Sequence, residues 1–395
     1  LPSPARGEGG LVLGRDLVRV MTFWSRFLAV FIKEFVQMRR DRITFAMMVG
    51  VPLMQLILFG YAINSDPKAL PTAVVMGENT TFARSIVTAL QNSAYFKMDG
   101  PPVSEAEADR LLRLGEVQFV VTIPVDFTRD VLRGRRPTLL VEADATDPAA
   151  TSNAIAALIS LNQTALDHDL TGPLSDVKNV PAPFDLQIHR RYNEEGITQF
   201  NIVPGLMGVV LTMTMVMMTG LAMTREQERG TMENLLAMPI RPLEVMLGKI
   251  TPYIFVGYVQ VAIIILAAHL LFAVPVLGSV PLLLAVAVFF IAANLSIGFT
   301  FSTVAKSQMQ AMQLSFFYFL PSMLLSGFMF PFRGMPVWAQ WIGEMLPLTH
   351  FLRIIRGIML KGNTPYEVWP NLWPIAAFMG AAMVLAMLRY RRTVA

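Results

Sequence analysis

Six long apolar runs, none containing Asp, Glu, Lys or Arg, most constrain what this chain can fold into. A bilayer core about 30 Å thick is crossed by roughly 20 helical residues, and the runs are near or above that length. Because a helix satisfies every peptide group within one lipid-exposed segment, each run predicts a transmembrane helix. The predicted spans are residues 43–63, 200–223, 250–272, 280–305, 309–330 and 372–388.

The composition agrees with a membrane protein. Only 15% of the residues are charged and the mean hydropathy is +0.51, whereas soluble domains carry about 25% charged residues. The net charge is +4, but the positive residues lie beside the apolar runs. They therefore indicate membrane orientation rather than nucleic-acid binding. The chain has no cysteine, which excludes disulfides, thiolate metal sites and cysteine nucleophiles.

The positive flanks predict an orientation. Lysine and arginine gather before residue 43, in the loop 224–249, at Lys306 and in the C-terminal tail. With six spans these regions share one side, which the positive-inside rule makes cytoplasmic, so both termini are expected there. Residues 64–199 fall on the opposite side and hold 18 acidic against 12 basic residues. The loop 331–371 is an exception, because it carries more basic than acidic residues on the predicted outer side.

Residues 64–199 have the pattern of an α/β domain. Strands are expected at 71–78, 117–127, 138–145 and 185–192, where β-branched residues cluster. Helices are expected at 80–92 and 104–114, and a longer one after Asp147, an N-cap residue followed by proline, toward Leu170. About 130 residues with this alternation can bury a core of their own.

The sequence therefore predicts an all-α bundle of six transmembrane helices with an extracytoplasmic α/β domain inserted between helices 1 and 2. Apolar residues on one face of 23–40 predict an amphipathic helix along the inner leaflet. The expected parts are a cytoplasmic N-terminus 1–42, transmembrane helix 1 at 43–63, the domain 64–199, and helices 2–6 at 200–395 with a cytoplasmic loop 224–249 and outer re-entrant or surface helices 331–371.

Hydrolytic or redox catalysis finds little support. The four histidines stand at no metal-ligand spacing, and no serine lies in a nucleophile-elbow pattern. Neither a phosphate-binding GxxxxGK[ST] loop nor a GxGxxG fingerprint occurs. We expect no metal and no cofactor on this chain, and if ATP drives it, the ATP-binding part must be another polypeptide.

The most informative segment is the loop "TREQERGTMENLLAMPIRPLEVMLGK" at 224–249. A helix that leaves the membrane into charged turns, followed by a short amphipathic helix, can pass a motion from a soluble partner to the bundle. The alternative is a solvated loop whose charges only fix the topology.

Six strings resemble, in order, those of the ABC-2 type permeases of ATP-binding-cassette exporters, and the resemblance covers nearly the whole chain from about Phe23. The string E-x-E-R-G-T-x-E-x-L stands here as Glu226 to Leu235. The others are "KEFVQMRRDR" (33–42), "FGYAIN" (59–64), "FNIVPG" (200–205), "PSMLLSGFMFPFRGMP" (321–336) and "LPLTHFLRIIRGIMLKG" (346–362). The subgroup is similar to the bacterial drug-export or sodium-export type.

The resemblance implies a permease that moves a hydrophobic or amphipathic, drug-like compound out across the bacterial cytoplasmic (inner) membrane by alternating access. Two copies of a separate ATPase subunit would use ATP and Mg. A second permease, identical or paralogous, would complete the pair in the membrane lipid. The external domain leaves room for a periplasmic partner, and nucleic acid is not expected.

Two groups of site residues follow. Carried over by position, the residues expected to transmit the ATPase stroke are Glu226, Glu228, Arg229, Gly230, Thr231, Glu233 and Leu235, supported by Lys33, Glu34, Arg39 and Arg40. Uncharged polar residues within the spans could line a translocation surface, or equally form hydrogen bonds between packed helices. They are Asn201, Thr212, Thr219, Asn294, Ser322 and Ser326.

Two other functions were weighed. An ion-gradient-driven secondary transporter predicts carboxylates within the membrane and usually inverted repeats, and neither is visible in the sequence. A receptor or assembly protein whose external domain binds a ligand predicts a cytoplasmic signalling domain. No inner segment here exceeds about 40 residues.

Overall fold

The computed structural model describes residues 67–98, 100–170, 182–228 and 242–394. All of these belong to one compact unit, residues 57–395. The predicted first span (43–63), the predicted amphipathic helix (23–40) and residues 229–241 of the loop 224–249 lie outside the described residues.

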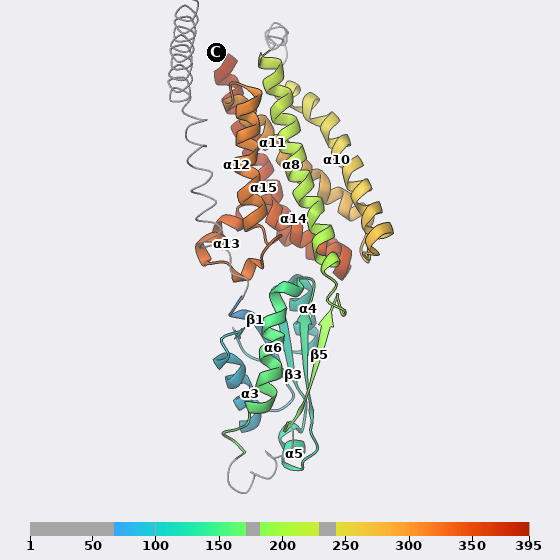
Figure 1. Cartoon of the computed structure of the whole chain (residues 1–395), viewed down its shortest axis with the longest axis vertical. Coiled ribbons are helices and arrows are strands. Elements are labelled where there is room, and N and C mark those ends of the chain that lie inside the picture. Colours follow the sequence, from blue (N-terminus) through green and yellow to red (C-terminus); the bar gives the residue numbers. More distant parts are fainter. Residues whose placement is uncertain (1–66, 99, 171–181, 229–241, 395) are drawn as a thin grey trace, which may run out of the picture. The chain divides into compact units, whose positions relative to one another are not determined.

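A five-stranded mixed sheet forms the core of the region before the first long helix (Figure 1). The strands lie in the order β2-β1-β3-β4-β5, and every neighbouring pair is parallel except β3 and β4. Their bounds are β1 (Leu70–Met76), β2 (Phe96–Lys97), β3 (Phe119–Ile123), β4 (Thr138–Asp144) and β5 (Asp185–Arg191). Strands β1, β3, β4 and β5 match the four predicted strands, although β1 begins one residue early, at Leu70. The two-residue strand β2 was not predicted.

The alternation of β3 shows how the sheet is covered. Phe119, Val121 and Ile123 pack into one apolar cluster with α3, α5 and α6, while Val120 packs on the other face with α4. Successive side chains of a strand point to opposite faces, so a strand buried on both faces is apolar throughout. The helices are α3 (Thr81–Asn92), α4 (Glu105–Leu114), α5 (Phe127–Leu132) and α6 (Pro148–Thr164).

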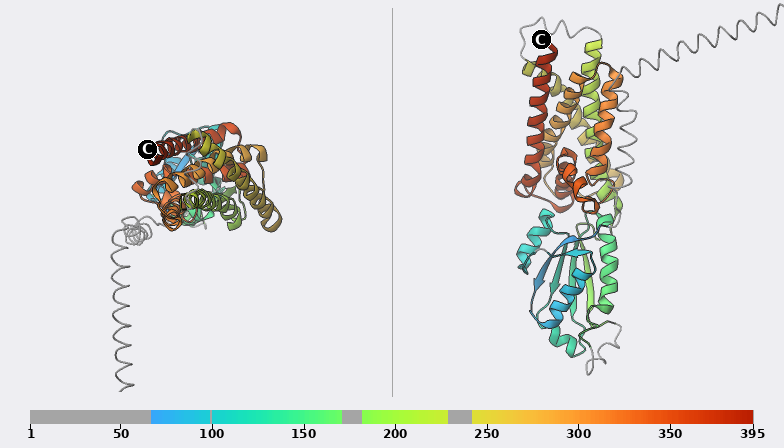
Figure 2. Two further views of the ribbon diagram at one scale, coloured as in Figure 1. Left: turned by 90° about the horizontal axis from the view of Figure 1, so that it is seen from above. Right: turned by 90° about the vertical axis from the view of Figure 1, so that its left-hand side faces the viewer.

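The remaining described residues form a helical bundle (Figure 2). Its long helices are α8 (Thr198–Glu228), α10 (Pro242–Phe272), α11 (Val280–Val304), α12 (Gln308–Leu325) and α15 (Pro365–Val394). Between α12 and α15 lie the turn η3 (Phe332–Gly334), α13 (Val337–Glu344), α14 (Pro347–Arg356) and the π-helical turn η4 (Gly357–Lys361). Helix α11 is central, since it contacts α8, α10, α12, α14 and α15.

Short helix α14 belongs to the bundle core. Its Leu348, Phe351 and Leu352 are buried, and the ring of Phe351 stacks on that of Phe290 in α11, with centroids 4.0 Å apart. The apolar residues of α14 therefore pack against long helices and do not face outward as in a surface helix.

Four described helices are long and apolar enough to cross a membrane: Thr198–Glu226, Pro252–Phe272, Val280–Val304 and Pro365–Arg389. They coincide with four of the six predicted spans. Helix α12 occupies the fifth predicted span, but three glutamines in its first two turns make it less apolar than the membrane-crossing stretches of the other four helices. It ends at Leu325, shortly before Gly327, whose φ is +82°. The count of six spans therefore stays a prediction.

Helix α15 extends beyond the sixth predicted span. The helix begins at Pro365, seven residues before the expected start. Glu367 accepts hydrogen bonds from the backbone N–H and the hydroxyl of Thr364, at 2.7 and 3.0 Å. Thr-x-x-Glu is a helix-start signal, and here it outweighs Pro370 and Pro374 inside the helix.

Candidate functional site

Glu228 is the last described residue of α8. It belongs to the coupling set, the residues predicted to transmit the ATPase stroke. One carboxylate oxygen accepts the backbone N–H of Gln308 at 2.8 Å, and the other accepts the side-chain amide of the same residue. Gln308 is the first residue of α12, 80 positions along the chain. The contact therefore joins the end of α8 to the start of α12.

The start of α12 receives two caps, from Ser307 and Glu228, and one further hydrogen bond from the chain before it. Ser307 accepts the N–H of Gln310 at 3.3 Å, and Gln310 accepts the N–H of Lys306 at 2.8 Å. The first four N–H groups of a helix have no partner within it, so Ser307 and Glu228 each satisfy one of them, whereas Gln310 ties back the residue before the N-cap. Glu228 adds a negative charge where the helix dipole is positive.

The contact with α12 also acts on the ionisation of Glu228. The hydrogen bonds from the side chain and backbone of Gln308 lower the pKa of Glu228 below its usual value. The side chain is exposed, so it stays ionised and accessible from the end of the bundle.

The structure describes only part of the predicted coupling set. Glu226 lies on the last turns of α8, two residues before Glu228. The other predicted members lie outside the described residues, so their roles remain predictions: Lys33, Glu34, Arg39, Arg40, Arg229, Gly230, Thr231, Glu233 and Leu235.

The predicted translocation residues are buried within this single chain. Four of them hydrogen-bond to a backbone carbonyl four residues earlier on the same helix, which is the usual way a polar side chain is satisfied inside a transmembrane helix. They are Thr212, Thr219, Asn294 and Ser322. Ser326 bonds the carbonyl three residues earlier. These hydrogen bonds are local to each segment and do not join two helices, so the role of these five residues stays a prediction.

Asn201 and Asn294 differ from the others, because each keeps a buried side-chain oxygen without a hydrogen-bond partner in the described part of the chain. The amide of Asn201 donates to Asp147 at 2.9 Å and so ties the start of α8 to the start of α6. Asp147 was predicted as the N-cap of α6 and occupies that position, but its carboxylate makes no capping hydrogen bond there.

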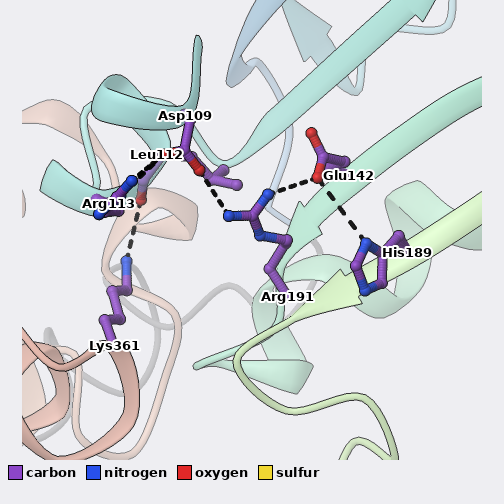
Figure 3. A network of polar contacts seen from close by, with 7 residues as sticks. All are labelled: Asp109, Leu112, Arg113, Glu142, His189, Arg191 and Lys361. Atoms are coloured by element: carbon purple, nitrogen blue, oxygen red, sulfur yellow. Dashed lines mark hydrogen bonds and ion pairs between the residues drawn. The ribbon is translucent and has the colours of Figure 1, made fainter. Parts of the chain in front are cut away.

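A second polar network joins α4, β4, β5 and the turn η4 (Figure 3). Arg191 makes ion pairs with Asp109 at 2.6 Å and with Glu142 at 2.7 Å. Lys361 donates to the carbonyl of Leu112 at 3.2 Å and pairs with Asp144 at 2.6 Å. Both charged groups of the last pair are nearly inaccessible to solvent.

Sequence reasoning did not single out the Lys361–Asp144 pair. One feature of the sequence could have indicated it: the loop 331–371 carries an excess of basic residues on the predicted outer side, where the positive-inside rule does not expect them. Two of them have acidic partners in the structure, since Lys361 pairs with Asp144 and Arg353 with Glu344. A charge held in an ion pair carries less information about membrane side than a free one.

Comparisons with known proteins agree with this architecture. The sequence model of the family described as "ABC-2 family transporter protein" matches residues 42–388. The chain is 28% identical over 380 residues to the "Probable multidrug ABC transporter permease YbhS" of Escherichia coli (strain K12), covering 93% of the chain and 97% of that protein. It is 30% identical over 363 residues to the "Inner membrane transport permease YhhJ" of the same strain, covering 87% and 93%.

A more distant relative is longer. The "ABC transporter G family member 20" of Dictyostelium discoideum is 22% identical over 366 residues, which cover 90% of this chain and 49% of that protein. The match therefore extends over nearly the whole of this chain and half of that relative.

Proposed function

The chain belongs to the ABC-2 family of transporter proteins, and on that premise we propose that it is the membrane subunit of an ATP-driven exporter. It lies in the bacterial inner membrane with both termini in the cytoplasm. It moves a hydrophobic or amphipathic, drug-like compound outward by alternating access. Hydrolysis of ATP, with its Mg, takes place on a separate ATPase subunit present in two copies.

The contact between Glu228 and Gln308 carries the mechanism. The coupling string begins at Glu226 and runs on from the end of α8. Glu228 holds that point to the first turn of α12. A push on the loop that follows therefore acts on two helices of the bundle at once. The ATPase pair can shift the bundle only as far as its contacts differ between the inward-facing and outward-facing states.

Two observations support the class of substrate. The name of one relative includes "multidrug". Span α8 carries five methionines in its central turns, and flexible thioethers suit varied apolar ligands. Met207 and Met215 are fully buried and belong to the bundle core. That leaves Met213, Met217 and Met218, which are partly exposed, as the members that can face a substrate.

A second permease subunit completes the translocation path. Helix α10 supports this, because most of its apolar side chains are not buried within the chain. Phe255, Ile263, Leu266 and Leu270 are all more than half exposed. Such a face requires lipid or another membrane helix. The partner is a second copy of this chain or a paralogue.

Replacing Glu228 with alanine tests the coupling role. We expect export to fall roughly fivefold while ATP hydrolysis is retained. Loss of a helix cap destabilises the conformation of the bundle that contains it by about 1 kcal/mol, which is roughly a fivefold change in its population. Replacing Glu226 with alanine as well should lower the export rate further. The measurement compares ATP hydrolysis with efflux of a fluorescent amphipathic dye, in proteoliposomes that contain the permease and its ATPase.

Glu105→Ala is the matched control, since Glu105 is an exposed carboxylate in the first turn of α4. It should leave both rates unchanged. Full export by the Glu226→Ala/Glu228→Ala double variant would remove these carboxylates from the mechanism. Parallel loss of hydrolysis and export would point to failed docking of the ATPase.

A further inference from the structure

A polar cavity of about 370 Å³ lies between the short helices α13 and α14, the start of α15 and the ends of β4 and α4. This volume is at the lower end of the range of small-molecule sites. Its walls mix charged residues with apolar ones such as Phe332, Leu352 and Val368. A cavity that is partly charged and partly apolar suits a ligand with both characters.

Ion pairs neutralise part of the charge on the cavity wall. Lys361 pairs with Asp144 at 2.6 Å, and Arg353 pairs with Glu344. These four residues therefore fix the walls. They leave little charge free for a ligand.

Arg356 has donors to spare. Its two terminal nitrogens share one acceptor, the carbonyl of Gly327, at 3.3 Å each. Its Nε is buried without a partner in the described part of the chain. A guanidinium has five N–H donors. Leaving donors of a buried charge unpaired is costly, so an anionic acceptor in the cavity would stabilise it.

Two charged residues near Arg356 affect the charge balance of the cavity. Arg333 lines the same cavity from an exposed position and makes no ion pair with any residue that the structure describes. Asp147 lines the same cavity; burial raises the pKa of its carboxyl, and the positive charge of Arg356 opposes this. The lining as a whole holds five basic and five acidic side chains, so Arg356 and Arg333 are distinguished by their spare donors and not by a surplus of positive charge.

The cavity also contains unsatisfied acceptors. The side-chain oxygens of Gln118 and Asn363 are buried without a hydrogen-bond partner among the described residues. Acceptors need a hydroxyl or N–H donor. A bare anion would satisfy Arg356 and leave these oxygens unpaired. A ligand that carries an anionic group next to a hydroxyl or amine would satisfy both.

Exposed aromatic residues mark the level of the cavity relative to a membrane. Trp338 and Trp341 lie on α13, and Trp369 and Trp373 lie on the first turns of α15; all four are exposed. The same two segments contribute wall residues to the cavity. Exposed tryptophans gather where a bilayer meets water, at the depth of the lipid head groups.

We propose that this cavity binds a phosphate ester that carries a hydroxyl or amine, such as the head group of a phospholipid, with Arg356 and Arg333 as the phosphate ligands. Arginine matches phosphate geometry through its planar fork of donors. The site is separate from the proposed coupling contact at Glu228. Binding requires neither ATP nor a partner subunit, so it can be tested whether or not the export function holds.

The test is isothermal titration calorimetry on the full-length protein in a non-phosphate detergent. Three probes are compared: dihexanoyl phosphatidylglycerol, dihexanoylglycerol with the same tails and no phosphate, and glycerol 3-phosphate with no tails. We expect the phosphate probes to bind and dihexanoylglycerol to bind at least roughly tenfold more weakly. Tighter binding of the phospholipid assigns the site to a lipid, and equal binding of glycerol 3-phosphate assigns it to a soluble ester.

Variants identify the ligands. Arg356→Gln should weaken phosphate binding roughly tenfold and Arg333→Gln roughly threefold, whereas Arg84→Gln, an exposed arginine on α3, should change nothing. Arg333 is exposed, so its variant gives a result even if Arg356→Gln fails to fold. The proposal is overturned if neither phosphate probe binds, if dihexanoylglycerol binds equally well, or if the Arg333 variant and any folded Arg356 variant bind like the wild type.

Discussion

Lys361→Met is expected to lower the free energy of unfolding by about 3–5 kcal/mol, because it leaves Asp144 as a buried carboxylate without its ion-pair partner. The two side chains are only 7% and 9% exposed and their charged atoms are 2.6 Å apart. Thr146 also donates to Asp144 but carries no charge. The measurement is unfolding in detergent followed by tryptophan fluorescence, with the wild type alongside.

Two further variants separate burial from loss of charge. Arg110→Met breaks the exposed ion pair with Glu107 and should cost less than about 1 kcal/mol. Adding Asp144→Asn to Lys361→Met removes the orphaned charge and should recover part of the loss. Equal destabilisation by Lys361→Met and Arg110→Met would show that the Lys361–Asp144 pair is not buried in solution.

Gly298→Ala is expected to destabilise the bundle by about 1–3 kcal/mol, as overpacking does in close-packed interiors. A Cβ at Gly298 in α11 would lie 2.5 Å from the backbone oxygen of Val216 in α8. Backbone atoms cannot move aside as a flexible side chain does, so the two helices must separate. The same unfolding measurement in detergent reports the loss.

Gly380→Ala supplies the matched control on α15, because nothing lies within 4 Å of a Cβ there. Alanine is the better helix former by about 1 kcal/mol, so this variant should stabilise the protein slightly. The two substitutions are chemically identical, yet their expected effects have opposite signs. A stable Gly298→Ala variant would mean that α8 and α11 do not approach as closely as the structure places them.

Local signals gave most of the helices and strands. The strand ranges around 138–145 and 185–192 and the helix starts at Ser104 and Asp147 depend on neighbouring residues, and the structure has them there. The early start of α15 was also encoded locally, in Thr364 and Glu367, but the tryptophans and prolines that follow concealed it.

Contacts between distant residues could not be predicted in the same way. The string from Glu226 marked Glu228 for a coupling role, but nothing near it in the sequence indicates Gln308 as its partner. Asp144 and Lys361 are 217 positions apart. Alternation and spacing report on neighbours within one element, and they carry no information about which elements meet.

The sequence by itself determined that this chain is a membrane protein with long apolar helices, and its ordered strings identified the ABC-2 family, because both properties are carried by residues that lie close together along the chain. Only the tertiary structure decided that α14 packs in the bundle core, that Glu228 caps α12, and that Lys361 and Arg356 lie around one polar cavity. These features depend on which surfaces bury one another, and burial is a property of the packed chain as a whole.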